Sequence, residues 1–191
     1  LDAPVVHSTI SRLVIDTNRR LNAPNLFWTL SEATHIPANV GLSVEEREQR
    51  ISRYYSPFHA AIDELLDARS REARESVLIC VHTFTPVYLG VARPWQVGVI
   101  HGRDTGFSQA LFDALVDQKP PLAAGWNEPY SARDGVTETL ERHGDARGFA
   151  GTMIEVRNNE LADDAGVAFW SDVLADGLQI ALERSTAEMR L

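Results

Sequence analysis

The most apolar stretch of the chain is residues 77–81, Val-Leu-Ile-Cys-Val, which contains no polar residue. A continuous run of this length is typical of a strand that is buried on both faces of a sheet. The run is followed by His82 and then by two threonines and a proline. Ligands bind beyond the carboxyl ends of the strands in open α/β sheets, so we expect this strand end to belong to a site.

Other apolar runs predict the remaining elements of the fold. Further strands are expected at residues 4–7, 12–16, 96–101, 122–124 and 152–157. Apolar residues at helical spacing predict helices at residues 107–118, 136–143 and 162–188. Strands that alternate with helices favour a three-layer α/β/α fold with a mostly parallel or mixed sheet. A length of 191 residues suits a single domain that covers residues 1–191.

The clearest helix signal begins at Ser43, which forms a capping box with Glu46. Apolar and aromatic residues then recur at helical spacing as far as Leu66. Pro57 lies inside this pattern, so we expect it to kink the helix or to divide it. The preceding residues 21–42 lack periodicity and predict a long loop, which is usually functional when it is ordered.

Composition and charge reduce the number of classes of binding partner that the chain could have. The net charge is −9, and no concentrated basic patch is present, which argues against nucleic-acid binding. The single cysteine, Cys80, rules out an internal disulfide and is predicted to be an inert core thiol. No apolar run approaches transmembrane length and no signal-peptide pattern is present, so we expect a cytoplasmic protein without a membrane partner.

Polar side chains that could perform chemistry follow several of the apolar runs. Asn18 and Arg19 combine an amide with a guanidinium, which suits a bidentate grip on a carboxylate. His82 is placed to be a metal ligand or a base. Arg93 and Trp95 offer a cation and a flat apolar wall to a substrate.

A second group of polar residues lies later in the chain. Asn127 and Tyr130 offer hydrogen-bond donors to a developing oxyanion, and His143 is a further candidate base. Glu155 stands in an otherwise apolar strand and either faces solvent or lies in a site. Structural alternatives stay open for the others, because Arg19 could pair with an acid, Asn127 could cap a turn and Tyr130 could belong to the core.

Taken in order, these clusters resemble the N-formylglutamate amidohydrolase family. The matching pieces are residues 11–19, 82–86, 93–95, 127–130, 139–143 and 154–157. The resemblance implies a fold similar to that of the zinc carboxypeptidases and related deacylases. It also implies hydrolysis of the amide bond in a small N-acylated amino acid such as N-formylglutamate.

The resemblance further implies a role for each cluster. Asn18 and Arg19 would hold the substrate carboxylate, and His82 would bind zinc. Tyr130 would be the next site residue in chain order, and Glu155 would activate the attacking water. Three protein ligands leave one zinc position open for a water molecule whose pKa falls to about 7, and a neighbouring carboxylate can take its proton.

The chain departs from the family pattern at its start, where the family has a strand, a histidine-bearing motif and an acidic residue. His82 is the one plausible zinc ligand in the chain. We therefore expect an inactive fragment that binds zinc weakly and associates into oligomers through an unpaired sheet edge. Two other readings stay open: a carboxylate-binding module that has lost its metal, and a metal-free hydrolase that uses His82 or His143 as a base with Glu155.

Overall fold

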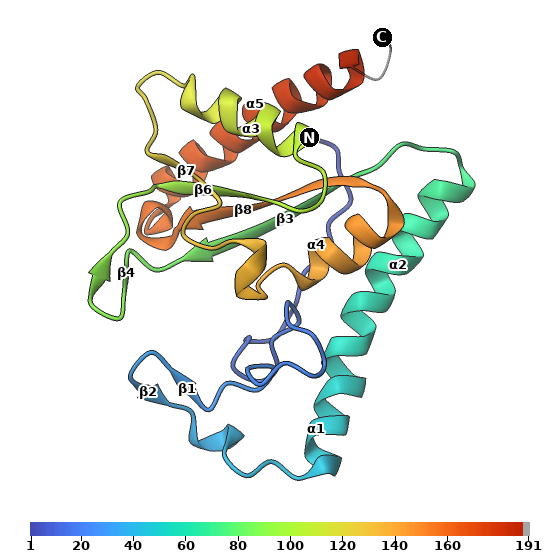
Figure 1. The fold of residues 1–191 in the computed structure, drawn as a ribbon, viewed down its shortest axis with the longest axis vertical. Coiled ribbons are helices and arrows are strands. Elements are labelled where there is room, and N and C mark those ends of the chain that lie inside the picture. The colour runs from blue at the N-terminus through green and yellow to red at the C-terminus, as the bar shows by residue number, and fades with distance from the viewer. Residues whose placement is uncertain (189–191) are drawn as a thin grey trace. The chain divides into compact units, whose positions relative to one another are not determined.

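The structure is a computed structural model (Figure 1). It describes residues 1–188, with side chains as far as residue 185. The chain divides into two compact units. One contains residues 2–76, and the other begins at Val77 and also includes Leu1. None of the described helices is long and apolar enough to cross a membrane.

The unit that begins at Val77 alternates strands with helices. Its main strands are β3 (Val77–Phe84), β6 (Val97–His101), β7 (Ala124–Trp126) and β8 (Ala150–Arg157), with a small hairpin of β4 (Val87–Tyr88) and β5 (Val91–Ala92). Its helices are α3 (Gly106–Val116), α4 (Glu138–His143) and α5 (Asp164–Glu188). The strands predicted at residues 96–101 and 152–157, and the helices predicted in this unit, are confirmed within a few residues. The strand predicted at residues 122–124 begins two residues later.

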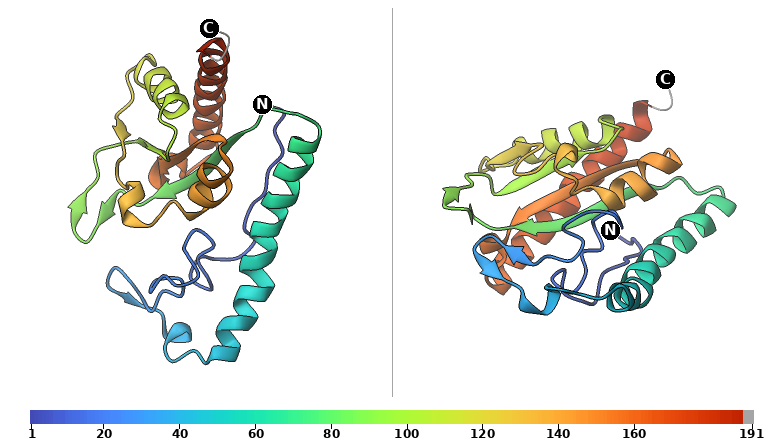
Figure 2. Two further views of the ribbon diagram at one scale, coloured as in Figure 1. Left: turned by 45° about the vertical axis from the view of Figure 1, so that its right-hand side comes forward. Right: turned by 60° about the horizontal axis from the view of Figure 1, so that its bottom comes forward.

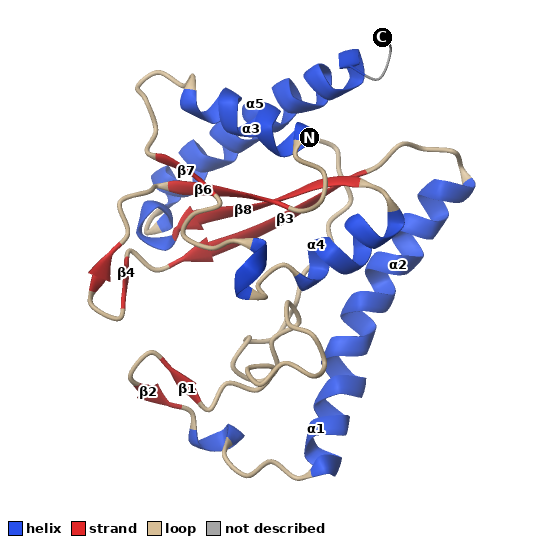
Figure 3. Ribbon diagram, viewed as in Figure 1, coloured by secondary structure: helices blue, strands red, loops and turns tan. Residues whose placement is uncertain are grey.

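The four main strands form one mixed sheet in the order β3-β8-β6-β7 (Figure 3). β3 is parallel to β8, β6 is antiparallel to β8, and β7 is parallel to β6. The predicted α/β class with a mixed sheet is therefore confirmed. β8 lies inside the sheet, and six of its eight residues are buried.

The expectation that residues 77–81 are buried on both faces is wrong for Val81, which is 61% exposed. Among the described strands, β3 pairs only with β8 and so forms an edge of the sheet. Val77 and Ile79 still pack against the main hydrophobic core, but the core does not extend to Val81. An uninterrupted apolar run therefore marks an edge strand here.

Helices cover both faces of this sheet (Figure 2). On one face, Val99 and Ile154 pack with residues of α3 and α5, including Leu111 and Trp170. On the other face, Met153 and its neighbours pack against α4. The expected three-layer α/β/α arrangement is therefore present within this unit. The prediction of a single domain for the whole chain stays a prediction.

Cys80 points to the α4 face and is buried there. Burial raises the pKa of this thiol to about 12, because a thiolate would lose its hydration in the apolar surroundings. The predicted core position of Cys80 is confirmed, and its inertness stays a prediction.

The unit of residues 2–76 consists of a loop-rich segment followed by a long helical stretch. Its elements are β1 (Leu30–Ser31), β2 (Thr34–His35), a 3-10 turn (Pro37–Asn39), α1 (Val44–Arg50), a π-helical turn (Ile51–Tyr55) and α2 (Ser56–Arg71). Its small core joins Ile15, Leu26 and Phe27 to Tyr55 of the π-helical turn. The unit therefore draws most of its core from loops.

The strands predicted at residues 4–7 and 12–16 are wrong, because both segments are irregular. Val5 is 79% exposed, so the first segment has no packing partner that would favour a sheet. In the second segment Ile15 enters the small core, while the Asp16 N–H bonds to the Leu26 carbonyl within the loop. The expected loop of residues 21–42 is present, with the short β1–β2 hairpin inside it.

The helix signal at Ser43 is confirmed. The Ser43 side chain accepts a bond from the Glu46 N–H, and the Glu46 carboxylate accepts one from the Ser43 N–H. The expected division at Pro57 is not found, because the chain stays helical from Val44 to Arg71, with a π-helical turn directly before α2. Proline has no N–H to donate, and the wider turn before it accommodates the lost helical hydrogen bond.

Candidate active site

The candidate site begins with Glu155 on β8. In the register of the sheet Glu155 lies between His82 of β3 and Gly98 of β6. Directly paired residues of neighbouring strands project to the same face, so Glu155 and His82 share the α4 face of the sheet. Glu155 is only 5% exposed, and β3 and β8 both approach their carboxyl ends here. The position is therefore the strand end at which α/β proteins place ligands.

Gly98 allows a loop to lie directly over the sheet beside Glu155. A Cβ at Gly98 would stand 1.8 Å from the carbonyl oxygen of Glu128 and 3.4 Å from Cδ of Pro129. No side chain fits there, so glycine is required for this close approach. The loop then continues to Tyr130. Gly98 is not among the site residues predicted from the sequence, although a glycine inside an apolar strand is the usual signal of such an approach.

Tyr130 meets Arg93, which comes from the loop before β6. The guanidinium of Arg93 donates to the Tyr130 hydroxyl at 3.1 Å and to the Thr85 hydroxyl at 3.5 Å. It also lies over the rings of Tyr88, Tyr130 and Phe84, at 4.6, 4.8 and 5.8 Å from their centroids. Arg93 is only 9% exposed. The predicted residues Arg93 and Tyr130 are thus brought together by the fold.

The backbone of Arg93 is held at the same end of the sheet as Glu155. Arg157 is the second residue after Glu155 on β8, and its guanidinium donates to the Arg93 carbonyl at 3.1 Å. The Arg93 N–H donates to the Pro86 carbonyl at 2.8 Å, just beyond the end of β3. Arg157 is itself paired with Glu160 at 2.6 Å. These contacts fix the segment between the β4–β5 hairpin and β6.

Trp95 and Asn127 contact the ends of β7. The Trp95 ring packs close to Gly125, where a Cβ would stand 2.8 Å from Cδ1 of the indole. Asn127 has a positive φ of 53°, its N–H donates to the Val99 carbonyl, and its side-chain oxygen accepts from the His101 N–H at 3.4 Å. The Asn127 amide therefore bonds to the end of β6, and its proposed role toward substrate stays a prediction.

His143 is the last residue of α4 and is fully buried. The next residue, Gly144, packs near Leu78 at the start of β3. Leu78 precedes His82 by four residues, or about 13 Å along a strand. The end of α4 therefore lies toward the opposite end of β3 from the Glu155–His82 pair. A catalytic role for His143 stays a prediction.

Asn18 and Arg19 lie in the unit of residues 2–76 and are both buried. The Asn18 N–H donates to the Asp16 carboxylate at 3.1 Å, and Nε of Arg19 lies 3.9 Å from the same carboxylate. The Arg19 carbonyl accepts from the Tyr55 hydroxyl at 3.0 Å, and its guanidinium lies 5.7 Å from the Trp28 ring centroid. Arg19 is therefore paired with an acid, as the structural alternative proposed, and its role toward a substrate carboxylate stays a prediction.

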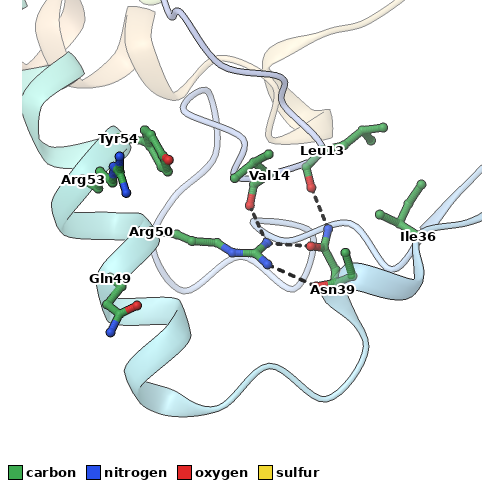
Figure 4. Close-up of a pocket in the computed structure, with 9 residues that line it drawn as sticks. Leu13, Val14, Ile36, Asn39, Gln49, Arg50, Arg53 and Tyr54 are labelled. Atoms are coloured by element: carbon green, nitrogen blue, oxygen red, sulfur yellow. Dashed lines mark hydrogen bonds between the residues drawn. The ribbon is translucent and has the colours of Figure 1, made fainter.

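A pocket of about 400 Å³ also lies within the unit of residues 2–76 (Figure 4). Arg50 crosses it and donates to the carbonyls of Val14 and Ala38 and to the side-chain oxygen of Asn39. Asn39 in turn donates to the Leu13 carbonyl at 2.7 Å. These bonds tie α1 to the loops, so the polar groups of this pocket serve the fold.

The residues that the structure describes contain no group of three or more His, Cys, Asp or Glu side chains that could hold a metal ion. Catalytic zinc sites use three protein ligands. His82 and Glu155 supply two donors, so these two residues do not by themselves fit a catalytic zinc site.

Comparisons with known proteins found a matching family and similar solved structures. A family model described as N-formylglutamate amidohydrolase matches residues 1–162. The structure of the gene product Atu2144 from Agrobacterium tumefaciens is similar with a TM-score of 0.88 at 34% identity, over 92% of this chain and 69% of that one. The N-formylglutamate amidohydrolase from Ralstonia eutropha JMP134 shares the fold, with a TM-score of 0.68 at 20% identity, over 90% of this chain and 73% of that one. No curated protein sequence matches.

Proposed function

This chain belongs to the N-formylglutamate amidohydrolase family of hydrolases, and we propose that its substrate is a small N-formyl amino acid such as N-formylglutamate. The observation that carries this proposal is the buried carboxylate of Glu155 beside His82 at the carboxyl ends of two parallel strands. Hydrolysis of an amide needs a base to activate water and an acid to protonate the leaving amine. One carboxylate can perform both steps in turn.

The proposed mechanism assigns Glu155 to take a proton from the attacking water and to deliver it to the leaving nitrogen. Burial beside apolar neighbours keeps bulk water from competing for this proton. Tyr130 is assigned to stabilise the oxyanion, as its hydroxyl is already oriented by Arg93. Asn18 and Arg19 are assigned to hold the substrate carboxylate, since a rigid fork converts binding energy into orientation of the scissile bond.

Metal dependence is a separate proposal in which His82 would supply one zinc ligand. Because the described donors do not complete a catalytic zinc site, no step above depends on a metal. A cytoplasmic location and association into homo-oligomers likewise stay predictions from the sequence.

The direct test is release of formate and glutamate from N-formyl-L-glutamate by the purified protein. The assay is run as purified, after treatment with a chelator, and after addition of Zn²⁺. Activity that a chelator removes and Zn²⁺ restores supports the metal-dependent enzyme, and activity that survives the chelator supports the metal-free hydrolase. Failure to release formate under all three conditions, combined with substrate binding in calorimetry, would support either a carboxylate-binding module or the inactive fragment expected from the sequence.

A further inference from the structure

Arg93 is a buried cation whose neighbours do not neutralise it. It is 91% buried, and its described polar contacts are the hydroxyls of Thr85 and Tyr130. No carboxylate among the described residues forms an ion pair with it. Charged groups are rarely buried without a partner, because removal from water costs far more than neutral hydrogen bonds return.

Aromatic rings stabilise Arg93 without cancelling its charge. Three rings lie within 6 Å of the guanidinium carbon, from Phe84 at the end of β3, Tyr88 in the β4–β5 hairpin and Tyr130. Such cation–π contacts leave the full positive charge available to an anion. Both of these hydrogen bonds use Nη1, so Nε and Nη2 keep their donors, which are arranged to bind a carboxylate side-on.

We infer that Arg93 binds the side-chain carboxylate of an acidic N-formyl amino acid and so determines a preference for glutamate over neutral residues. This inference rests on the proposed function, in which the substrate is a small N-formyl amino acid. A glutamate derivative has one further carboxylate, and Arg93 is the buried guanidinium held at the same sheet end as Glu155. The aromatic walls also suit the two methylene groups of a glutamate side chain.

Three substrates distinguish the contribution of the side-chain carboxylate to turnover from that of the α-carboxylate. N-formyl-L-glutamate carries both, N-formyl-L-glutamine replaces the side-chain carboxylate by a neutral amide of the same shape, and N-formyl-L-isoglutamine does the same at the α-carboxylate. We expect wild-type protein to prefer glutamate to glutamine by about 10²-fold or more in kcat/KM, because a site built for an ionic bond rejects the analogue that cannot form it.

Arg93→Gln should abolish this preference. Because Arg93 also orients the Tyr130 hydroxyl, kcat/KM should fall for both substrates, but the ratio of kcat/KM for N-formyl-L-glutamate to that for N-formyl-L-glutamine should fall by about 10²-fold. Discrimination against N-formyl-L-isoglutamine should persist. Arg93→Lys keeps the charge but not the fork, so it should recover part of the preference. The matched control is Arg103→Gln, at an exposed arginine beyond the other end of β6. It should change neither the glutamate-to-glutamine ratio nor the glutamate-to-isoglutamine ratio of kcat/KM.

Binding to wild-type protein provides a second measurement that does not depend on the variants or on turnover. L-glutamate should bind more tightly than L-glutamine in calorimetry, and the difference should vanish in Arg93→Gln. If no N-formyl substrate is hydrolysed but this difference is found, the proposed reaction is wrong and the assignment of Arg93 stands. Equal affinities of wild-type protein for glutamate and glutamine, or an unchanged preference in folded Arg93→Gln, overturn the assignment.

Discussion

Glu155 of β8 and His82 of β3 are direct neighbours in the parallel register of the sheet, and their side chains share one face. The pairing is a consequence of strand order, since 72 residues of sequence separate the two positions. It places a carboxylate and an imidazole, the two groups most used in proton transfer, at one strand end.

The first prediction concerns Glu155→Gln, which keeps the shape of the side chain and removes the base. We expect kcat for N-formyl-L-glutamate to fall by roughly 10²–10⁴. Thermal unfolding should show a folded variant. Glu75→Gln, at an exposed position before β3, should retain full activity as the control. If folded Glu155→Gln stays within a few-fold of wild-type activity, Glu155 is structural and the proposed mechanism is wrong.

The second prediction concerns Arg19→Lys. A lysine cannot reproduce a bidentate guanidinium contact, so KM for N-formyl amino acids should rise by about tenfold with a smaller change in kcat. The same substrates amidated at the α-carboxylate should be poor for wild-type protein. Arg71→Lys, an exposed change in the last turn of α2, is the control. Equal turnover of the acid and the amide by wild-type protein would remove Arg19 from the substrate site.

The third prediction concerns Gly98→Ala. The added Cβ would stand 1.8 Å from the Glu128 carbonyl oxygen, so the loop over the sheet must move. Such overpacking should lower the free energy of unfolding by about 1–3 kcal/mol. The displaced loop should also weaken the bond between Tyr130 and Arg93 and reduce kcat/KM. Both effects are measured by denaturant unfolding and steady-state kinetics.

Gly106→Ala provides the comparison for this variant. Gly106 begins α3, and a Cβ there would have its nearest contact at an ordinary 3.4 Å, so alanine should be tolerated or slightly stabilising. Equal stability and activity of the two alanine variants would contradict the close approach seen at Gly98.

The fourth prediction concerns Cys80. Burial raises its pKa from 9.0 to about 12, so the thiol of folded protein should not react with a disulfide reagent at pH 8 and should react once urea unfolds the chain. Because the folded state holds the proton more tightly, this contribution to stability is complete below about pH 9 and is lost as the pH rises toward 12. Rapid modification without denaturant would show that the packing of α4 against the sheet opens readily.

Local sequence signals predicted much of the fold because their physical causes are local. The capping box at Ser43 needs only two side chains three residues apart, and it forms as expected. The apolar pattern of residues 152–157 predicted the buried strand β8. The strand expected at residues 12–16 did not form, because Ile15 is buried by loop residues rather than by a sheet.

The sequence by itself determined the α/β class, the family resemblance and the residue types of the candidate site, since these follow from periodicity and from motifs that are read in order. Strand order and register were decided only by the tertiary structure. They place Gly98 beneath the Glu128 carbonyl, Glu155 beside His82, and Arg93 beside Tyr130. Each of these contacts joins segments far apart in the chain, and such contacts depend on how whole strands and loops pack, which no local pattern encodes.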